Sequence, residues 1–159
     1  MKIGVVSDTH SRPIPAQVLE SFKNVDLIIH AGDFCSVEDF KKFQKVKTVK
    51  AVYGNMDEHQ LREMLPERDI VTLDNFKIGI YHGRGEANQI LSSVQEEFQN
   101  EKVNAVIFGH SHRPFNEELN GVLYFNPGSP NDTIFAPYCS YGILEAREGK
   151  IVGKIIKVK

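Results

Sequence analysis

The sequence contains no tryptophan and only two cysteines, Cys35 and Cys139. Two cysteines in a chain of 159 residues do not make a disulfide scaffold, so we expect reduced thiols and a cytoplasmic protein. No apolar stretch approaches the roughly 20 residues that span a bilayer, and the N-terminus begins directly with a strand-like segment, which a signal peptide does not. The net charge of −2 suggests no nucleic-acid surface. These absences favour an ordinary globular protein with a small-molecule substrate or a protein partner.

The length and the periodicity predict one α/β domain over residues 1–159. In the first third, short apolar runs alternate with segments whose apolar residues recur at helical spacing. We expect strands over residues 2–7, 26–30 and 47–53, and helices over residues 14–23 and 37–45. This alternation predicts a largely parallel sheet covered by helices.

The rest of the chain adds strands of a different character. After residue 55 we expect helices over 58–64 and 86–99, a hairpin of 70–73 with 76–81, and a buried strand over 103–108. The last third has short strands separated by Asn-Gly and Glu-Gly turns, at 115–119, 122–125, 141–146 and 151–158. We expect that part to be antiparallel, so that the whole is a mixed or two-sheet α/β protein.

Five of the apolar runs end in side chains that bind metal ions, each with a glycine nearby. The clearest is the run 105–108, which is followed by Gly109, His110, Ser111 and His112. Two histidines two residues apart on an extended chain point the same way. In open α/β sheets, binding sites gather outside the carboxyl ends of the strands. The candidate ligands in chain order are Asp8, His10, Asp33, Asn55, His82, His110 and His112.

The chemistry of these donors indicates which ions they suit. Mixed imidazole and oxygen donors favour Mn, Fe, Zn, Co or Ni over calcium or a structural zinc site. Seven donors are too many for one tetrahedral ion, and they are about right for two ions that share a carboxylate. Two metals roughly 3.5–4 Å apart can stabilise both the attacking and the leaving oxygen of a displacement at phosphorus. We therefore expect two divalent transition-metal ions, and favour Mn.

As a set, these motifs resemble the signature of the calcineurin-like metallophosphoesterases, in their compact bacterial and archaeal phosphodiesterase branch. The matching segments are Asp8-Thr9-His10, Gly32-Asp33, Gly54-Asn55, His82-Gly83, Gly109-His110-Ser111-His112 and Asn126-Pro127-Gly128-Ser129. The resemblance implies a four-layer α-β-β-α sandwich, in which two mixed β-sheets are flanked by helices. It also implies one metal on Asp8, His10, Asp33 and His112, and a second on Asp33, Asn55, His82 and His110, with Asp33 as the bridge.

The implied activity is hydrolysis of a small phosphodiester by attack of a hydroxide that bridges the two metals. Asp33 and Asn55 would then be the catalytic residues, because Asp33 bridges the ions and Asn55 helps them to stabilise the developing charge. Two alternatives remain: a non-catalytic metal-binding scaffold for protein partners, as the similar small subunit of the retromer complex implies, and a phosphomonoesterase. Family members often form homo-oligomers, so a dimer or larger assembly is possible.

The sequence departs from the family pattern at two positions. Many members have a histidine directly after the metal-binding asparagine, near the leaving group, whereas this chain has Met56, and a thioether donates no proton. We expect either that the substrate's leaving group needs little protonation, as in aryl diesters, or that Asp57 or His59 replaces the missing acid. Arg84 stands where related chains often have histidine, and we interpret Arg84 and Asp57 as candidate substrate-binding residues.

Overall fold

The structure, a computed structural model, describes residues 1–159 as ten strands and four helices. The helices are α1 (Ala16–Phe22), α2 (Val37–Gln44), α3 (His59–Met64) and α4 (Ile90–Glu97). The first six strands are β1 (Lys2–Val6), β2 (Leu27–His30), β3 (Val49–Ala51), β4 (Arg68–Leu73), β5 (Phe76–Tyr81) and β6 (Ala105–Ile107). The last four are β7 (Phe115–Leu119), β8 (Val122–Asn126), β9 (Ser140–Arg147) and β10 (Lys150–Lys157). Every element expected from the sequence is present.

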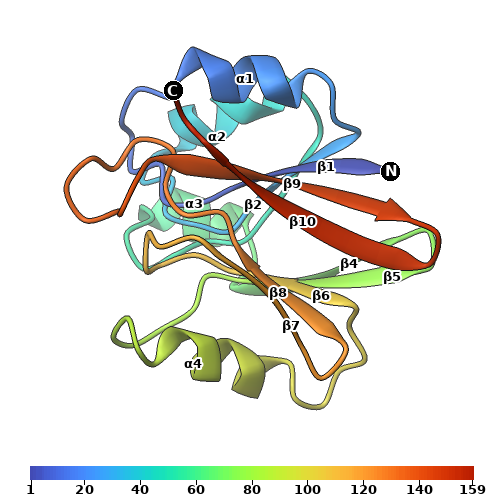
Figure 1. Cartoon of the computed structure of the whole chain (residues 1–159). Helices are drawn as coiled ribbons and strands as arrows, with labels where there is room; N and C mark the ends of the chain where they lie inside the picture. The colour runs from blue at the N-terminus through green and yellow to red at the C-terminus, as the bar shows by residue number, and fades with distance from the viewer.

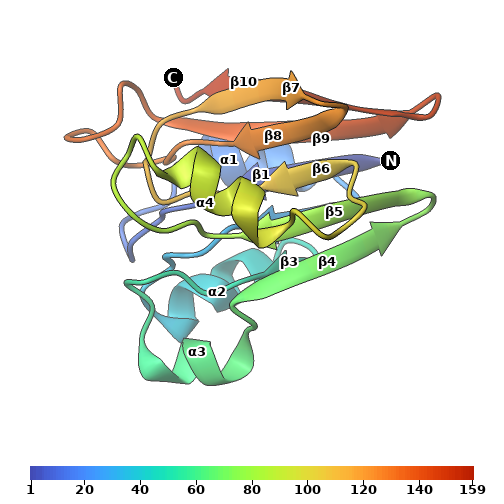
Figure 2. The same ribbon diagram turned by 90° about the horizontal axis from the view of Figure 1, so that it is seen from below.

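The strands form two five-stranded mixed sheets that pack face to face. The first sheet has the order β10-β9-β1-β2-β3, and the second has the order β4-β5-β6-β8-β7. Helices α1 and α2 cover the outer face of the first sheet and α4 covers that of the second, so that Figure 1 shows four layers. Seen from below, α4 lies across the second sheet, and α3 lies beyond the edge where β3 and β4 meet (Figure 2). The fold is the expected four-layer α-β-β-α sandwich.

Each layer boundary has its own apolar core. Between the sheets lie alternate residues of the central strands, such as Val5, Ile29, Ile80 and Ile107, all fully buried. A second core packs α1, α2 and α3 on the first sheet, and a third packs α4 on the second. Because successive side chains of a strand point to opposite faces, buried strands between two layers must be apolar throughout. This is why the central strands β1, β2 and β6 consist of apolar runs, whereas the edge strands β7 and β10 carry exposed charged residues.

The structure corrects two expectations. The last third is only partly antiparallel: β7 pairs antiparallel with β8, and β9 with both β10 and β1, but β8 pairs parallel with β6. The chain runs from β6 to β7 at the sheet edge and returns in β8, so β8 must run in the direction of β6. The second correction concerns α4, which begins at Ile90 and not at residue 86. Residues 86–89 instead form a turn in which Gln89 N donates to Glu86 O.

The topology brings the predicted ligands to one end of the sandwich. Strands β1, β2 and β3 are mutually parallel, and so are β5, β6 and β8. Their carboxyl ends lie on the left in Figure 1, below and beside the loop that joins β8 to β9.

None of the four helices has the length and the apolar character that a membrane-spanning helix needs.

Candidate metal centre

The predicted ligands occupy the loops that follow five strand ends. Asp8 and His10 follow β1, Asp33 follows β2, Asn55 follows β3, His82 follows β5, and His110 and His112 follow β6. The first sheet supplies the carboxylates and the second supplies three of the four histidines of this set. The structure brings all seven side chains into one site, where Asp8, Asp33 and His82 are buried and the other four are partly or largely exposed.

The backbone at these positions is strained in a regular way. Asp8, His10, Asp33, His110 and His112 have φ values of 57°, 48°, 60°, 71° and 57°. A non-glycine residue seldom adopts positive φ, and such residues cluster at functional sites when the surrounding structure holds them there. Here Asp8 N donates to Gly32 O and His10 N to Asp33 O, both at 3.0 Å. These bonds tie the loop after β1 to the loop after β2.

Two glycines allow the ligand loops to approach one another closely. A Cβ added at Gly109 would lie 2.0 Å from Ser7 Oγ, and one at Gly54 would lie 2.1 Å from Asp33 Oδ1. Any larger residue at either position would therefore collide with the loop that carries a candidate ligand. The glycines of the Gly-His and Gly-Asn pairs thus serve packing between loops.

The ligand atoms form two clusters. In the first, which we call the Asp8 cluster, Asp8 Oδ1 lies 3.4 Å from His112 Nε2 and 3.8 Å from His10 Nε2, and the two Nε2 atoms are 3.0 Å apart. In the second, the Asn55 cluster, Asn55 Oδ1 lies 3.1 Å from His82 Nε2 and 3.0 Å from His110 Nδ1. The His82 Nε2 and His110 Nδ1 atoms are 3.2 Å apart.

Asp33 lies between the two clusters. Its Oδ2 is 3.3 Å from His82 Nε2 and 3.7 Å from His10 Nε2, while its Oδ1 accepts the Met56 backbone N–H at 2.8 Å. Ligand atoms bound at about 2.0–2.2 Å from one ion lie about 3.0–3.5 Å from one another. The Asn55 cluster, with separations of 3.0–3.2 Å, lies within that range, and the two carboxylate contacts of His10, at 3.7 and 3.8 Å, lie just above it. The residues therefore suit a pair of transition-metal ions with Asp33 Oδ2 near both clusters.

Each candidate histidine has its second ring nitrogen fixed by another group. His82 Nδ1 donates to Ala31 O at 2.8 Å, and His110 Nε2 donates to Gly85 O at 3.0 Å. His10 Nδ1 contacts Cys35 Sγ at 3.4 Å, and His112 Nδ1 contacts Asp132 Oδ2 at 2.5 Å. Metal-bound histidines are usually oriented in this way by an outer partner, which also fixes the tautomer. The arrangement leaves the inner nitrogen of each ring for a metal.

The candidate ligands shift one another's pKa values. Burial alone would lower the pKa of His82 and of His112. Hydrogen bonding and charge from Asp33 and Asp8 outweigh burial at His82, and those from Asp8 and Asp132 outweigh it at His112, so that both pKa values are raised to about 9. Burial lowers the pKa of His10 more than Asp8 and Asp33 raise it. The pKa of Asp33 is lowered, because the hydrogen bond and charge of His82 and the Met56 N–H outweigh burial. Two of the imidazoles thus hold protons where a metal would bind, so protons and metal compete for the site.

Comparison with known proteins agrees with this geometry. The family model described as the calcineurin-like phosphoesterase superfamily domain matches residues 1–149. The chain belongs to this superfamily. It is 35% identical to a phosphodiesterase of Methanocaldococcus jannaschii, over 80% of this chain and 83% of that protein.

Solved structures extend the comparison to the fold. The structure of an archaeal phosphodiesterase superimposes with a TM-score of 0.80 and 29% identity, over 98% of this chain and all of the other. Vps29 of Chaetomium thermophilum superimposes with a TM-score of 0.81, over 99% of this chain and 97% of the other, at only 18% identity. The likeness to Vps29 therefore concerns the fold alone.

Sequence reasoning did not find Asp132, which this phosphoesterase domain places behind His112. Asp132 is fully buried in the loop between β8 and β9. Its Oδ2 accepts from His112, and its Oδ1 accepts from the backbone N–H groups of Ile134 and Phe135 and from Arg12. Burial acts to raise the pKa of Asp132, yet these hydrogen bonds hold it well below its usual range. No spacing rule links residue 132 to a strand end, so the sequence offered no signal.

The segment Asn126-Pro127-Gly128-Ser129 holds the ligand loops and contributes no ligand itself. Asn126 Nδ2 donates to Gly109 O at 3.0 Å, and Ser129 Oγ donates to Asp8 O at 2.8 Å. His30, which precedes Asp33, is also supporting: Gly32 N donates to its Nδ1, and its Nε2 lies 3.1 Å from Thr9 Oγ1. Burial holds the pKa of His30 well below its usual value, so this ring is neutral.

The structure changes the interpretation of Asp57 and His59. Asp57 is 4% exposed, and its carboxylate accepts the backbone N–H groups of Asp33, Cys35 and Gly54 at 2.7–3.0 Å. With both oxygens bonded to backbone beneath the ligand loops, Asp57 cannot face a substrate or replace the missing acid, and we correct both expectations. His59 lies at the surface of α3, where it pairs with Glu63 at 3.0 Å. It shares no contact with the ligand residues.

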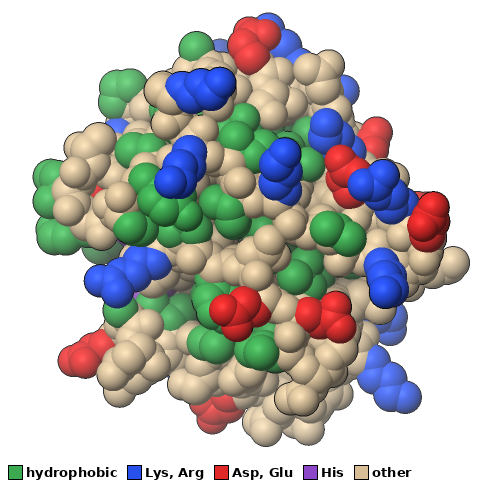
Figure 3. All heavy atoms as spheres, viewed as in Figure 1, with side chains coloured by type: hydrophobic (Ala, Val, Ile, Leu, Met, Phe, Trp, Pro, Cys, Tyr) green, Lys and Arg blue, Asp and Glu red, His purple; other side chains and the backbone are tan.

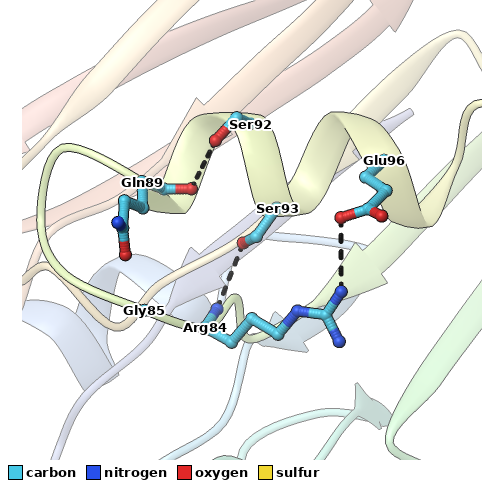
Figure 4. A pocket seen from close by; sticks show the side chains of 6 residues that line it. All are labelled: Arg84, Gly85, Gln89, Ser92, Ser93 and Glu96. Carbon is cyan, nitrogen blue, oxygen red and sulfur yellow. Dashed lines mark hydrogen bonds and ion pairs between the residues drawn. The ribbon is translucent and has the colours of Figure 1, made fainter.

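Arg84 lies beside the centre and points away from it. Its Nη2 donates to Glu96 Oε2 at 3.3 Å and its backbone N donates to Ser93 Oγ, so the side chain runs along α4 (Figure 4). The surface hollow drawn there, about 420 Å³ in volume, contains no candidate ligand. The guanidinium is largely exposed, and only a change of rotamer could bring it to a phosphate at the metal centre.

The face shown in Figure 3 carries no concentrated basic patch. Lys and Arg side chains are scattered over this face, Asp and Glu side chains lie among them mainly on the right and below, and apolar side chains appear between them (Figure 3). The absence of a basic surface on this face agrees with the net charge of −2.

Proposed function

We propose that this phosphoesterase hydrolyses a small phosphodiester with two divalent metal ions, one in the Asp8 cluster and one in the Asn55 cluster. The observation that carries the proposal is the position of Asp33 Oδ2, which lies 3.3 Å from a histidine of one cluster and 3.7 Å from a histidine of the other. A carboxylate oxygen within reach of both clusters can bridge two ions. Manganese remains our first choice of metal, with Ni, Fe, Zn or Co as alternatives.

The proposed division of labour follows from the contacts. Two ions bound there would lower the pKa of a water molecule and neutralise charge on the phosphate. Asp33 fixes the spacing of the two clusters, because its Oδ1 is held by the Met56 N–H. Asn55 uses its Oδ1 toward His82 and His110, which leaves its amide NH₂ free to donate to a phosphate oxygen.

Neither Met56 nor Asp57, the two residues that follow Asn55, can protonate a leaving group. Met56 is 58% exposed beside Asn55 and has no proton to give, while Asp57 is committed to backbone N–H groups. General-acid catalysis is typically worth 10²–10⁴-fold in rate. We therefore propose that good substrates have leaving groups of low pKa, as aryl diesters do.

A second candidate function is a protein-interaction scaffold. One observation favours it: Ile134 and Phe135 are 72% and 73% exposed in the loop between β8 and β9, beside the metal centre. Exposed apolar residues of this size often contact a partner, and Vps29 shares the fold. The complete and well-oriented set of ligands favours the enzyme, because a scaffold does not need strained backbone at five ligand positions.

The deciding experiment is hydrolysis of bis(p-nitrophenyl) phosphate by metal-stripped protein to which Mn, Ni, Zn or Mg is added back, beside p-nitrophenyl phosphate. We expect metal-dependent diester turnover that exceeds monoester turnover and is lost in His112→Ala. Equal or greater monoester turnover would favour a phosphomonoesterase. No turnover with any metal, by protein shown to bind two ions, would overturn the proposed activity and favour the scaffold.

A further inference from the structure

A cavity of about 230 Å³ adjoins the Asn55 cluster. Asn55 and His82 form its inner wall, so anything bound in it lies against the metal centre. Its remaining charged and aromatic lining residues are Tyr53, Arg62, Glu67, Tyr81 and Arg84. Pockets for drug-sized ligands are roughly 300–1,000 Å³ and mostly apolar. This cavity is smaller and more polar, which suits one ring system attached to a phosphate.

The most ordered part of the lining is a pair of flat groups. The guanidinium carbon of Arg62 lies 5.5 Å from the centroid of the Tyr53 ring. Arg62 is held in place by two backbone carbonyls: its Nε donates to Asp57 O at 2.9 Å and its Nη2 to Asn55 O at 2.6 Å. Arg62 forms no ion pair with a carboxylate, so its charge is compensated only by these carbonyl dipoles. A fixed, planar cation beside a half-buried tyrosine forms a stacking surface.

The chemistry of this surface selects a class of ligand. Flat aromatic rings and nucleobases stack on tyrosine rings and on guanidinium planes. Tyr81, only 5% exposed, closes one wall, and the Glu67 carboxylate can accept N–H groups at the rim. An alkyl group would gain only from apolar burial on this surface, whereas an aryl group or a nucleobase would also stack on it.

We infer that this cavity binds a flat aromatic group, an aryl ring or a nucleobase, carried by the phosphodiester whose phosphate lies at the metal centre. The inference rests on the proposed function and adds the substrate class. Arg62 has two roles in it, because the guanidinium that stacks on the ring also holds the carbonyl of the ligand Asn55. An aromatic group in the cavity therefore lies against the element that positions one metal ligand.

Three phosphonates test this inference without any leaving-group chemistry. Measured at a pH well above the second pKa of all three, phenylphosphonate, cyclohexylphosphonate and methylphosphonate present the same dianionic head group to the metals, so they differ mainly in what enters the cavity. We expect the metal-loaded protein to bind phenylphosphonate about tenfold more tightly than methylphosphonate, a difference within the range that one stacked ring contributes. Calorimetry measures the dissociation constants, and competitive inhibition of diester hydrolysis measures them independently. Cyclohexylphosphonate, similar in apolar area but not flat, should gain at most about threefold.

Variants then assign the effect to the stacking surface. Tyr53→Leu should reduce the phenyl-to-methyl ratio to about two, while Tyr53→Phe should keep it, because the ring and not the hydroxyl stacks. Arg62 is exposed on α3 but also holds the Asn55 carbonyl, so Arg62→Met can weaken all three phosphonates together; the phenyl-to-methyl ratio cancels that common change, and it should fall as well. Tyr138→Leu is the matched control, because it removes a tyrosine that pairs with a cation, Lys157, outside this cavity.

The outcomes separate this inference from the proposed function. Loss of metal weakens all three phosphonates together, whereas loss of the stacking surface weakens only the phenyl compound. A phenyl-to-methyl ratio near one in the unmodified protein, or a ratio unchanged in both Tyr53→Leu and Arg62→Met, would overturn the inference while diester hydrolysis persisted. Equal gains for phenyl and cyclohexyl would also overturn it, in favour of simple apolar burial. No metal-dependent binding of any phosphonate, with no diester turnover, would instead count against the proposed function.

Discussion

The two halves of the metal centre are supported by different kinds of group. In the Asp8 cluster, the outer nitrogens of His112 and His10 contact side chains, the Asp132 carboxylate and the Cys35 thiol. In the Asn55 cluster, the outer nitrogens of His82 and His110 donate to the backbone carbonyls of Ala31 and Gly85. A carboxylate behind a histidine raises its basicity as a ligand more than a neutral carbonyl does. Single side-chain substitutions can therefore change how the histidines of the Asp8 cluster are held, whereas the orientation of those in the Asn55 cluster depends on the backbone path of the loops.

The halves also differ in what lies on their open side. The Asp8 cluster is bordered by the loop with Ile134 and Phe135, and the Asn55 cluster by Met56 and by the cavity that Arg62 lines. We therefore expect the substrate and its leaving group to contact the Asn55 side. On the Asp8 side we expect the neighbouring residues to support the metal ligands. Four substitutions or conditions test this difference, and the largest effect belongs to the residue that both halves share.

Asp33→Asn should abolish most activity, because the amide cannot serve two cations with one negatively charged oxygen. We expect kcat for an aryl phosphodiester to fall more than about 100-fold, beyond the 10–100-fold typical of losing an outer-sphere partner. Metal content, measured on the same sample, should fall below two ions per chain. Asp26→Asn is the matched control, since Asp26 Oδ2 only accepts the Lys2 N–H. Near-normal turnover in Asp33→Asn with both metals retained would refute the shared role.

Asp132→Asn should weaken only one half. Replacing the charged Oδ2 behind His112 removes its carboxylate partner, and we expect one of two metal affinities to fall about 10–100-fold while the other stays within about twofold. Two-site calorimetry with Mn or Zn measures both affinities. Arg12→Gln provides the comparison, because Arg12 contacts the same carboxylate at 3.4 Å and forms no hydrogen bond with a metal ligand. If both affinities fell equally in Asp132→Asn, the substitution would have disturbed the loop as a whole, and the assignment to one half would be wrong.

Met56→His should supply the missing acid on the Asn55 side. Met56 is exposed and its backbone N–H already holds Asp33, so the new imidazole starts from a fixed main chain. We expect hydrolysis of a diester with an alkyl leaving group to rise roughly tenfold, below the 10²–10⁴ typical of an evolved general acid, and that of an aryl diester to change little. Rates for the two leaving groups, measured side by side, give the comparison. An unchanged alkyl-diester rate would show that the absent histidine does not limit the reaction.

The site residues show how far the sequence alone could predict this protein. The apolar runs and the ligands at their ends predicted the strands and the convergence of seven side chains, because parallel strands must end at one edge. Asp132 was not predicted, because its role depends on a long loop returning from β8, and no periodic pattern encodes such a return. Asp57 was assigned to the substrate because it follows Asn55. Its actual role depends on three backbone N–H groups from two loops, which only the folded chain brings together.

The smallest expected effect is a dependence of metal affinity on pH that both halves share. His82 and His112 have pKa values of about 9 in the metal-free protein, and a ring must lose its proton before it can bind a metal. Apparent affinity should therefore rise with pH across the range below about 9 and level off above it, and metal binding at pH 7.5 should release protons. Titration in buffers of different ionisation enthalpy measures that release. Asp132→Asn removes the charge that favours His112 in its protonated form, so this variant should release fewer protons while its affinity is lower. A proton release equal to that of the unmodified protein would mean that the carboxylate behind His112 does not set its protonation, and that the two halves are alike in this respect.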